Sequence, residues 1–257
     1  MNESEQLFER LLNRLKNLGG AAIALSGGVD SCFLAYAAAC ADRENFAAYY
    51  VKSAFQPEFE LSDALRTAQE LGLTLKVISV DILACGEVVC NPADRCYHCK
   101  KRIFSAICKA AAADGFTTIL DGTNASDAED DRPGMRALKE IGVLSPLREC
   151  GLTKADIRRL AHEAELFTWN KPSYACLATR IPTGQRITAS LLRRTEEAES
   201  YLFSLGFTDF RVRTVGDMAK LQLRERQLPL LLEHREEILN KLGCAYSSVC
   251  LDLEVRK

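Results

Sequence analysis

The chain has 257 residues and a mass of 28.5 kDa, and its 47% hydrophobic and 26% charged residues are the balance of an ordinary globular protein. A formal net charge of −2 and an isoelectric point near 6.0 provide no overall basic surface for nucleic acid. No apolar run approaches the ~20 residues of a membrane span, and the polar, acidic N-terminus does not resemble a signal peptide.

The first part of the chain alternates predicted helices and strands. Apolar residues at helical spacing before Gly19 predict an amphipathic helix over residues 7–18. Further along, the pattern predicts strands at 21–25, 46–51, 73–80 and 117–120, and helices at 32–38, 58–71 and 97–113. Because strands that alternate with helices form a parallel sheet covered on both faces, the predicted fold class is α/β.

The segment Ser26-Gly27-Gly28-Val29-Asp30-Ser31 joins the first predicted strand to the helix after it. A strand, a tight turn and a helix direct unpaired N–H groups and the positive end of the helix toward one point, which suits a phosphate. Gly27 and Gly28 let the backbone approach an anion, Ser26 and Ser31 can add hydroxyl donors, and Asp30 can hold Mg²⁺. A Walker A loop is excluded because it is longer and ends in Gly-Lys-Ser/Thr.

This six-residue motif resembles the PP-loop of the ATP pyrophosphatase superfamily, whose members cleave ATP between its α and β phosphates and adenylylate a substrate. The resemblance implies an adenine nucleotide alpha hydrolase-like fold. Ligands of such sheets bind beyond the carboxyl ends of the strands, so Gly122 in the turn after residues 117–120 is expected to face the PP-loop. The acidic stretch 127–134, with Arg132, is either a solvated loop or part of the nucleotide site.

Prolines and a glycine interrupt the periodicity over residues 169–184 and predict a loop or domain junction. Beyond it the pattern predicts a helix at 189–205, strands at 210–215 and 218–223, a helix at 225–242 and a strand at 247–255. We therefore expect a PP-loop domain at residues 1–184 and a small C-terminal α+β domain for substrate binding or oligomerisation at residues 185–257. We also expect a homo-oligomer.

Eleven cysteines in a chain with no export signal indicate a reducing compartment, so we expect a cytoplasmic protein in which some cysteines bind metal or react. Cys96 and Cys99 form a C-x2-C pair before a predicted helix, and Cys176 in the irregular loop is the natural third ligand. Three thiolates on a [4Fe-4S] cluster leave one iron open, whereas structural zinc needs a fourth ligand, Cys90 or His98. From spacing alone, a cluster, a zinc site and a bare dithiol remain open.

The order of motifs over nearly the whole chain is similar to that of the LarE family, ATP-dependent sulfur transferases of nickel-pincer nucleotide cofactor synthesis. The resemblance implies pyridinium-3,5-biscarboxylic acid mononucleotide as substrate, with its carboxylates adenylylated, pyrophosphate released and thiocarboxylates formed. It also implies Mg-ATP as cofactor and Arg132 at the ATP site. The motifs that carry it are the PP-loop, Leu120-Asp121-Gly122, Asp127 with Asp130, Arg132-Pro133-Gly134, Trp169-Asn170-Lys171, Cys176, Arg180-Ile181-Pro182 and Arg211-Val212-Arg213.

Two sulfur sources occur within this family. One branch sacrifices the sulfur of a single cysteine, which Cys176 matches, and leaves dehydroalanine. In the other branch three cysteines, matched by Cys96, Cys99 and Cys176, hold a [4Fe-4S] cluster whose open iron delivers sulfide. The resemblance makes the cluster the preferred interpretation, and Cys176 the predicted catalytic residue on either route.

Arg211 and Arg213 are predicted to bind the phosphate of the substrate nucleotide. Residues i and i+2 of a strand share a face, so their two guanidinium groups can converge on one anion. Arg180 is a third candidate, and Glu199 is assigned to the same site by its match to an acidic family position. Ordinary surface ion pairs are the alternative for the two strand arginines.

Three other functions stay open. A PP-loop enzyme of tRNA thiolation would need a basic face or an RNA-binding module, and neither is visible in the sequence. An amide-forming ligase of the NAD synthetase kind would not require the three cysteines. A nucleotide-sensing or metal-storage module would bind ATP and metal without releasing pyrophosphate.

Overall fold

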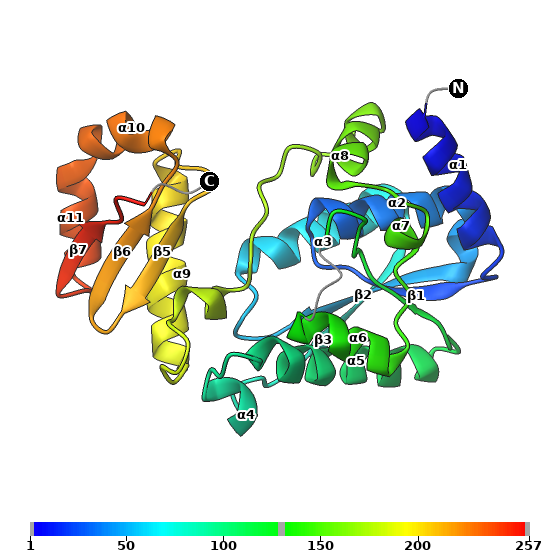
Figure 1. The fold of residues 1–257 in the computed structure, drawn as a ribbon, viewed down its shortest axis with the longest axis horizontal. Helices are drawn as coiled ribbons and strands as arrows, with labels where there is room; N and C mark the ends of the chain where they lie inside the picture. The colour runs from blue at the N-terminus through cyan, green and yellow to red at the C-terminus, as the bar shows by residue number, and fades with distance from the viewer. Residues whose placement is uncertain (1–2, 128–131, 255–257) are drawn as a thin grey trace. The chain divides into compact units, whose positions relative to one another are not determined.

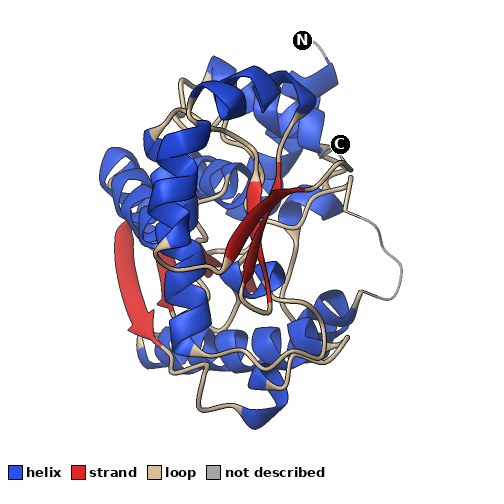
Figure 2. Ribbon diagram, turned by 90° about the vertical axis from the view of Figure 1, so that its left-hand side faces the viewer, coloured by secondary structure: helices blue, strands red, loops and turns tan. Residues whose placement is uncertain are grey.

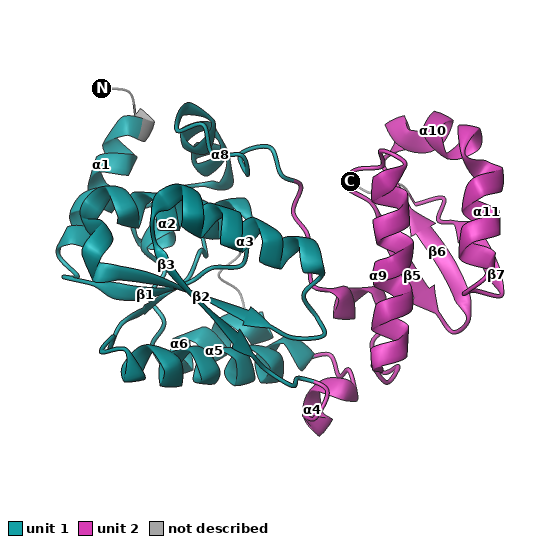
Figure 3. Ribbon diagram, turned by 180° about the vertical axis from the view of Figure 1, so that it is seen from behind, with its two compact units in different colours: residues 1–82, 94–171 teal, residues 83–93, 172–257 magenta. Residues whose placement is uncertain are grey.

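The computed structural model describes residues 3–127 and 132–254, so Asp130 lies outside the described residues. The chain forms two compact units, coloured separately in Figure 3. Unit 1 comprises Met1–Ile82 and Asp94–Lys171, and unit 2 comprises Leu83–Ala93 and Pro172–Lys257. Among the described helices, none has the length and apolar character needed to span a bilayer.

Unit 1 is built on a four-stranded parallel sheet in the order β3-β2-β1-β4 (Figure 1). The two central strands, β1 and β2, are almost entirely buried, as expected for a parallel sheet covered on both faces. The predicted α/β class is confirmed. The strands are β1 (Ala21–Ala24), β2 (Phe46–Lys52), β3 (Thr74–Ser79) and β4 (Ile119–Leu120).

Helices cover both faces of this sheet, as Figures 1 and 2 show. Alternate residues of a strand point to opposite faces, so Ile23 and Tyr50 enter one hydrophobic core while Ala22 and Tyr49 enter the other. The first core is closed by α1 (Glu3–Lys16), α2 (Val29–Asp42), α3 (Glu58–Leu71), α7 (Pro146–Glu149) and α8 (Lys154–Glu163). The second core is closed by α5 (Arg95–Ala113) and α6 (Pro133–Ile141).

Unit 2 contains a three-stranded sheet in the order β5-β6-β7, with β5 antiparallel and β7 parallel to β6. Its core face packs against α9 and α11 through apolar residues such as Leu202, Val212 and Leu242. The expected helix over 225–242 is broken at His234, which separates α10 from α11. The elements are α4 (Gly86–Val89), α9 (Ala189–Ser204), β5 (Arg211–Val215), β6 (Met218–Gln222), α10 (Leu228–Glu233), α11 (Arg235–Gly243) and β7 (Ser248–Leu251), with short 3-10 turns η2 (Leu177–Arg180) and η3 (Glu225–Gln227). A further 3-10 turn, η1 (Arg43–Asn45), belongs to unit 1.

The unit boundary lies before Pro172 rather than after Gly184, where the sequence pattern placed the end of the first domain. Residues 172–184 join unit 2 through contacts with α9 and β5, such as the Arg180–Glu199 ion pair and the bond from Arg211 to the Ser173 carbonyl. The segment Leu83–Ala93 joins the same unit by binding the 181–187 backbone. Buried Asn91 donates from its side chain to the Pro182 carbonyl at 2.7 Å, and its own carbonyl accepts from the Gly184 N–H at 2.8 Å. Contacts between segments far apart in sequence leave no local pattern to read.

Candidate active site

The PP-loop connects the end of β1 to the start of α2. The Ser31 hydroxyl accepts from the Ser26 N–H and donates to the Gly28 carbonyl, both at 3.1 Å, which ties the loop to the first turn of the helix. The hydroxyl oxygens of Ser26 and Ser31 are 3.0 Å apart. Gly28 is the N-cap residue and makes no side-chain cap, so the first N–H groups of α2 are available to an anion.

Two glycines allow backbone approaches that no other residue would permit. Gly27 has a φ of +75°, and a Cβ placed on it would lie 2.6 Å from the Glu60 carbonyl oxygen of α3. A Cβ on Gly122 would lie 2.8 Å from the Ser31 backbone nitrogen. The turn after β4 therefore packs directly on the start of α2, at the carboxyl edge of the sheet.

Asp30 lies at the start of α2, and one of its two carboxylate oxygens accepts a hydrogen bond while the other has no partner among the described residues. Its Oδ2 accepts from Lys154 Nζ at 2.5 Å, whereas Oδ1 is buried with no hydrogen-bond partner among the described residues. Burial raises the pKa of Asp30, and the Lys154 ammonium opposes that shift. Ser26–Ser31 and the first N–H groups of α2 form the predicted phosphate site, called the phosphate cradle below. A buried, unpartnered carboxylate oxygen beside it fits Mg²⁺, because this ion binds through one or two carboxylates and substrate phosphates.

Two lysines lie at this loop that the sequence did not predict as site residues. Lys154 is the first residue of α8, whose start is fixed by a capping box between Thr153 and Asp156. Lys171 donates to the Gly27 carbonyl at 2.7 Å and pairs with Asp63 of α3. The capping signal could be read locally, but no sequence pattern connects Lys154 to Asp30, 124 residues away.

The turn after β4 is fixed by its own polar side chains. The Asp121 carboxylate accepts from the hydroxyls of Thr123 at 2.5 Å and Ser145 at 2.6 Å. The Asp127 carboxylate accepts from the Asn124 N–H at 3.0 Å, so this residue belongs to an ordered turn. Arg132 is the N-cap residue of α6 and has an exposed side chain.

The C-x2-C pair occupies the first turn of α5 in unit 1. Cys96 and Cys99 are three residues apart on a helix and thus share a face, and both are at least partly exposed. Arg95 Nη2 lies 3.8 Å from Cys96 Sγ, which places a cation beside a thiol. Gly134 of α6 packs on this turn, because a Cβ there would lie 3.8 Å from Cys96 Cβ. Two accessible thiols on one helix face fit a shared metal centre.

Cys176 precedes η2 in unit 2, so unit 1 holds two of the three predicted metal ligands and unit 2 the third. Within the described ranges, no group of three or more His, Cys, Asp or Glu side chains is arranged to hold a metal ion. His98, a candidate zinc ligand, lies 3.4 Å from the Asp94 carboxylate instead. The donor types fit a cluster or zinc.

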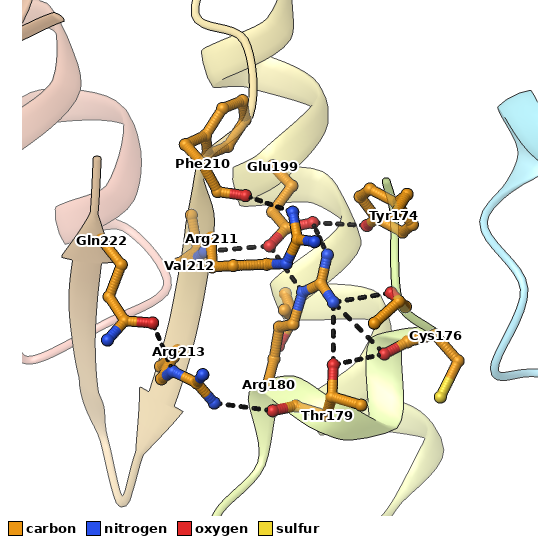
Figure 4. Close-up of polar contacts among 12 residues, drawn as sticks. Tyr174, Cys176, Thr179, Arg180, Glu199, Phe210, Arg211, Val212, Arg213 and Gln222 are labelled. Carbon is orange, nitrogen blue, oxygen red and sulfur yellow. Dashed lines mark hydrogen bonds and ion pairs between the residues drawn. The ribbon is translucent and has the colours of Figure 1, made fainter. Parts of the chain in front are cut away.

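Arg180 and Glu199 form a buried ion pair in unit 2 (Figure 4). Arg180 Nε lies 2.8 Å from Glu199 Oε1 and Nη2 lies 3.0 Å from Oε2, and the side chains are 0% and 2% exposed. The two side chains are paired with each other in this structure, and their role at the substrate phosphate stays a prediction. A phosphate would have to enter the protein interior and displace Glu199 to reach the Arg180 guanidinium.

Arg211 and Arg213 lie on the face of β5 opposite to the core residue Val212. Arg211 is buried and donates to the Ser173 carbonyl at 2.8 Å. Arg213 is half-buried and donates to the Thr179 carbonyl at 2.8 Å. The structure therefore brings both arginines and the backbone around Cys176 together within unit 2 (Figure 4).

Comparisons with known proteins agree with these features. Residues 2–102 match the family model described as NAD synthase, which covers the PP-loop and under half of the chain. The chain is 36% identical over 256 residues to an uncharacterized protein of Synechocystis sp., covering 97% of this chain and 94% of that protein. An uncharacterized protein of Methanocaldococcus jannaschii is 31% identical over 234 residues, covering 91% and 89%.

A further relative connects the fold to a reaction. Pyridinium-3,5-bisthiocarboxylic acid mononucleotide synthase of Lactiplantibacillus plantarum is 34% identical over 247 residues, which is 95% of this chain and 89% of that enzyme. The match spans the PP-loop unit and the unit that holds Cys176. The chain therefore belongs to the LarE-like family of PP-loop enzymes, to which pyridinium-3,5-bisthiocarboxylic acid mononucleotide synthase also belongs.

Proposed function

We propose that this protein adenylylates the carboxylates of pyridinium-3,5-biscarboxylic acid mononucleotide with ATP and then replaces oxygen by sulfur to give thiocarboxylates for nickel-pincer cofactor synthesis. The observation that carries the proposal is the phosphate cradle around Asp30, in a chain aligned over 247 residues with the Lactiplantibacillus synthase. An amide-forming ligase shares the PP-loop fold, but the alignment of that synthase extends through Cys176 and the second unit.

Activation solves the difficulty that a carboxylate oxygen is a poor leaving group. The substrate carboxylate attacks the α-phosphorus of ATP, the bond to the β-phosphate oxygen breaks, and pyrophosphate leaves. Ser26, Ser31 and the N–H groups of α2 would hold the phosphates, and Asp30 would hold a Mg²⁺ ion, which neutralises phosphate charge when bound. Gly27 and Gly122 allow the close backbone packing that shapes this loop, Gly28 caps α2 without a side chain, and Arg132 is proposed as a further cation.

The substrate carries its own phosphate, for which Arg211 and Arg213 are the proposed ligands. Both guanidinium groups belong to one face of β5 and lie beside the Cys176 loop through their contacts with the Ser173 and Thr179 carbonyls. Recognition of the phosphate here would place the substrate near Cys176 within unit 2. The Arg180 and Glu199 pair supports the loop from the interior instead of contacting the phosphate.

For the sulfur source we propose a [4Fe-4S] cluster held by Cys96, Cys99 and Cys176, with sacrifice of the Cys176 sulfur as the second route. When bound, such a cluster supplies an open iron that can carry a sulfide. Cys96 and Cys99 share a face of α5 in unit 1, and Cys176 lies in the irregular segment before η2 in unit 2.

The proposal is tested with Mg-ATP and the pyridinium nucleotide substrate. We expect pyrophosphate and AMP to form only when the substrate is present. Mass spectrometry should then detect a product in which sulfur has replaced oxygen. Formation of ADP and orthophosphate would contradict the PP-loop assignment. Pyrophosphate release with an amide product and ammonia as co-substrate would favour a ligase, and thiolated tRNA nucleosides would favour a tRNA enzyme.

The sulfur source needs anaerobically purified protein. We expect about four irons per chain, and loss of both iron and repeated turnover in Cys→Ala variants at Cys96, Cys99 or Cys176. Dehydroalanine at Cys176 after one turnover, with Cys96→Ala and Cys99→Ala still active, would establish the sacrificial route. Sedimentation of the same samples checks the expected homo-oligomer.

A further inference from the structure

The buried Arg180–Glu199 pair needs an explanation beyond folding stability. Removing two charges from water costs several kcal/mol per ion before their attraction is counted, and apolar replacements of such pairs are often no less stable. The pair has almost no exposed surface, and two parallel hydrogen bonds join its members. We therefore look for the role of this pair in the one Arg180 nitrogen that does not bind Glu199, and in the groups to which it donates.

Arg180 uses its third nitrogen to hold the backbone of the loop that contains Cys176. Nη1 donates to the Ala175 carbonyl at 2.6 Å, approaches the Cys176 carbonyl at 3.3 Å, and reaches the Thr179 hydroxyl at 2.8 Å. Arg211 holds Ser173, three residues before Cys176, through its carbonyl at 2.8 Å. The backbone on both sides of Cys176 is therefore fixed by guanidinium groups (Figure 4).

Tyr174 links this loop to the ion pair. Its hydroxyl donates to Glu199 Oε2, and its ring lies 4.3 Å from the Arg180 guanidinium carbon and 5.1 Å from that of Arg211. Glu199 Oε1 also accepts from the Val212 N–H of β5 at 2.9 Å. The loop is thus connected through Glu199 to the sheet of unit 2.

We propose that Tyr174, Arg180 and Glu199 form a clamp that positions Cys176 for sulfur transfer. The Cys176 side chain points away from the Arg180 guanidinium in Figure 4, so the clamp acts on the backbone and leaves the sulfur side of the residue outside it. These are positioning residues, because the hydrogen bonds of Arg180 to this loop end on the Ala175 and Cys176 carbonyls and the Thr179 hydroxyl. A fixed backbone lowers the entropic barrier to sulfur transfer, whether Cys176 holds the cluster or gives up its own sulfur.

The test compares two Tyr→Phe variants of the full-length protein. Tyr174→Phe removes the hydroxyl that reaches Glu199 and keeps the ring beside the two arginines. Tyr246→Phe is the matched control, because Tyr246 is also buried in unit 2 and its hydroxyl lies 3.1 Å from that of Thr214. In Tyr174→Phe we expect amide hydrogen exchange across residues 173–181 to accelerate about tenfold, and in Tyr246→Phe to stay at the wild-type rate.

Kinetics separate positioning from general damage. For Tyr174→Phe we expect kcat of sulfur insertion to fall about tenfold, while KM for the nucleotide and the single-turnover rate of pyrophosphate release stay unchanged. Unchanged exchange over 173–181, or faster exchange with normal sulfur insertion, would overturn the clamp. Because the inference rests on the role of Cys176 in the proposed function, wild-type protein that inserts no sulfur would refute that function, and hydrogen exchange alone would then decide the clamp.

Discussion

The PP-loop of unit 1 and the Cys176 loop of unit 2 are both irregular segments that lead into a helical turn, yet they are held in opposite ways. The PP-loop is fixed by close backbone contacts at Gly27 and Gly122, and it leaves helix N–H groups and one Asp30 oxygen without protein partners among the described residues. The Cys176 loop is fixed by charged side chains that are paired in the interior.

The difference follows from what each loop has to bind. In an anion site the N–H donors stay without protein partners, because the bound anion has to accept their hydrogen bonds. The free-energy cost of removing these N–H groups from water is compensated only when the anion binds. A loop that presents a reactive side chain gains from a backbone whose polar groups are already satisfied, since no ligand has to replace those contacts. We therefore expect substitutions in unit 1 to impair activation and substitutions in unit 2 to impair substrate recognition or sulfur transfer.

The largest expected effect belongs to Asp30. In Asp30→Ala the proposed Mg²⁺ ligand is lost, and pyrophosphate release should fall by roughly 10²-fold or more. Asp42→Ala, at the other end of α2, is the matched control and should retain activity. A pyrophosphate assay at saturating Mg-ATP measures both variants, and equal rates would remove Asp30 from the site.

The next effect concerns the substrate phosphate. Arg213→Ala should cost about 1.5–3 kcal/mol of nucleotide binding, which is roughly a ten- to hundredfold increase in KM for the nucleotide, while KM for ATP is unchanged. Arg224→Ala is the control, because Arg224 pairs with Asp209 elsewhere in unit 2. Steady-state kinetics with each substrate varied in turn separate the two binding sites, and equal nucleotide KM values in both variants would contradict the assignment.

A third effect tests the close packing around the PP-loop. Gly122→Ala places a Cβ 2.8 Å from the Ser31 nitrogen, and we expect a loss of about 1–3 kcal/mol in the free energy of unfolding, with slower pyrophosphate release. Gly243→Ala in α11 meets no atom within 4 Å and should change stability by less than ~1 kcal/mol. Urea unfolding of both variants makes the comparison, and equal stabilities would mean that the backbone shifts freely at Gly122.

The smallest effect is a shift along the pH axis. Lys154 lowers the pKa of Asp30 against the larger opposing effect of burial, so Lys154→Ala should raise that pKa further. Mg²⁺ needs the ionised carboxylate, and the acid limb of the pH–rate profile for pyrophosphate release should therefore move to higher pH. Exposed Lys139 on α6 provides the control substitution, Lys139→Ala. An acid limb that stays in place would show that the Asp30–Lys154 contact has no part in activation.

Much of the fold could be predicted because its signals are local. Hydrophobic periodicity and glycine ends placed most helices and strands, and the strand–loop–helix order placed the phosphate cradle at the carboxyl edge of the sheet. Cys32 begins the apolar run at 32–38 that predicted helix α2, and it is buried, which raises its pKa to about 11.

The remaining features depend on contacts that no local pattern encodes. Nothing near Arg180 or Glu199 in the sequence shows that the two charges pair in the interior, and an arginine on its own is usually exposed. The pairing of Lys154 with Asp30 and the docking of Leu83–Ala93 in unit 2 likewise join distant parts of the chain. Long-range pairing decided these roles, and only the folded chain displays it.

The central claim is that residues of unit 1 activate the carboxylate and that Cys176 of unit 2 is needed for sulfur insertion. Cys176→Ala tests this claim most directly, in a single experiment that measures pyrophosphate and product mass together. The account predicts that this variant still releases pyrophosphate when ATP and the pyridinium nucleotide are present, because activation uses residues of unit 1, and that it forms no thiocarboxylate. Sulfur insertion at the wild-type rate by Cys176→Ala, or loss of pyrophosphate release together with sulfur insertion in a folded variant, would contradict it.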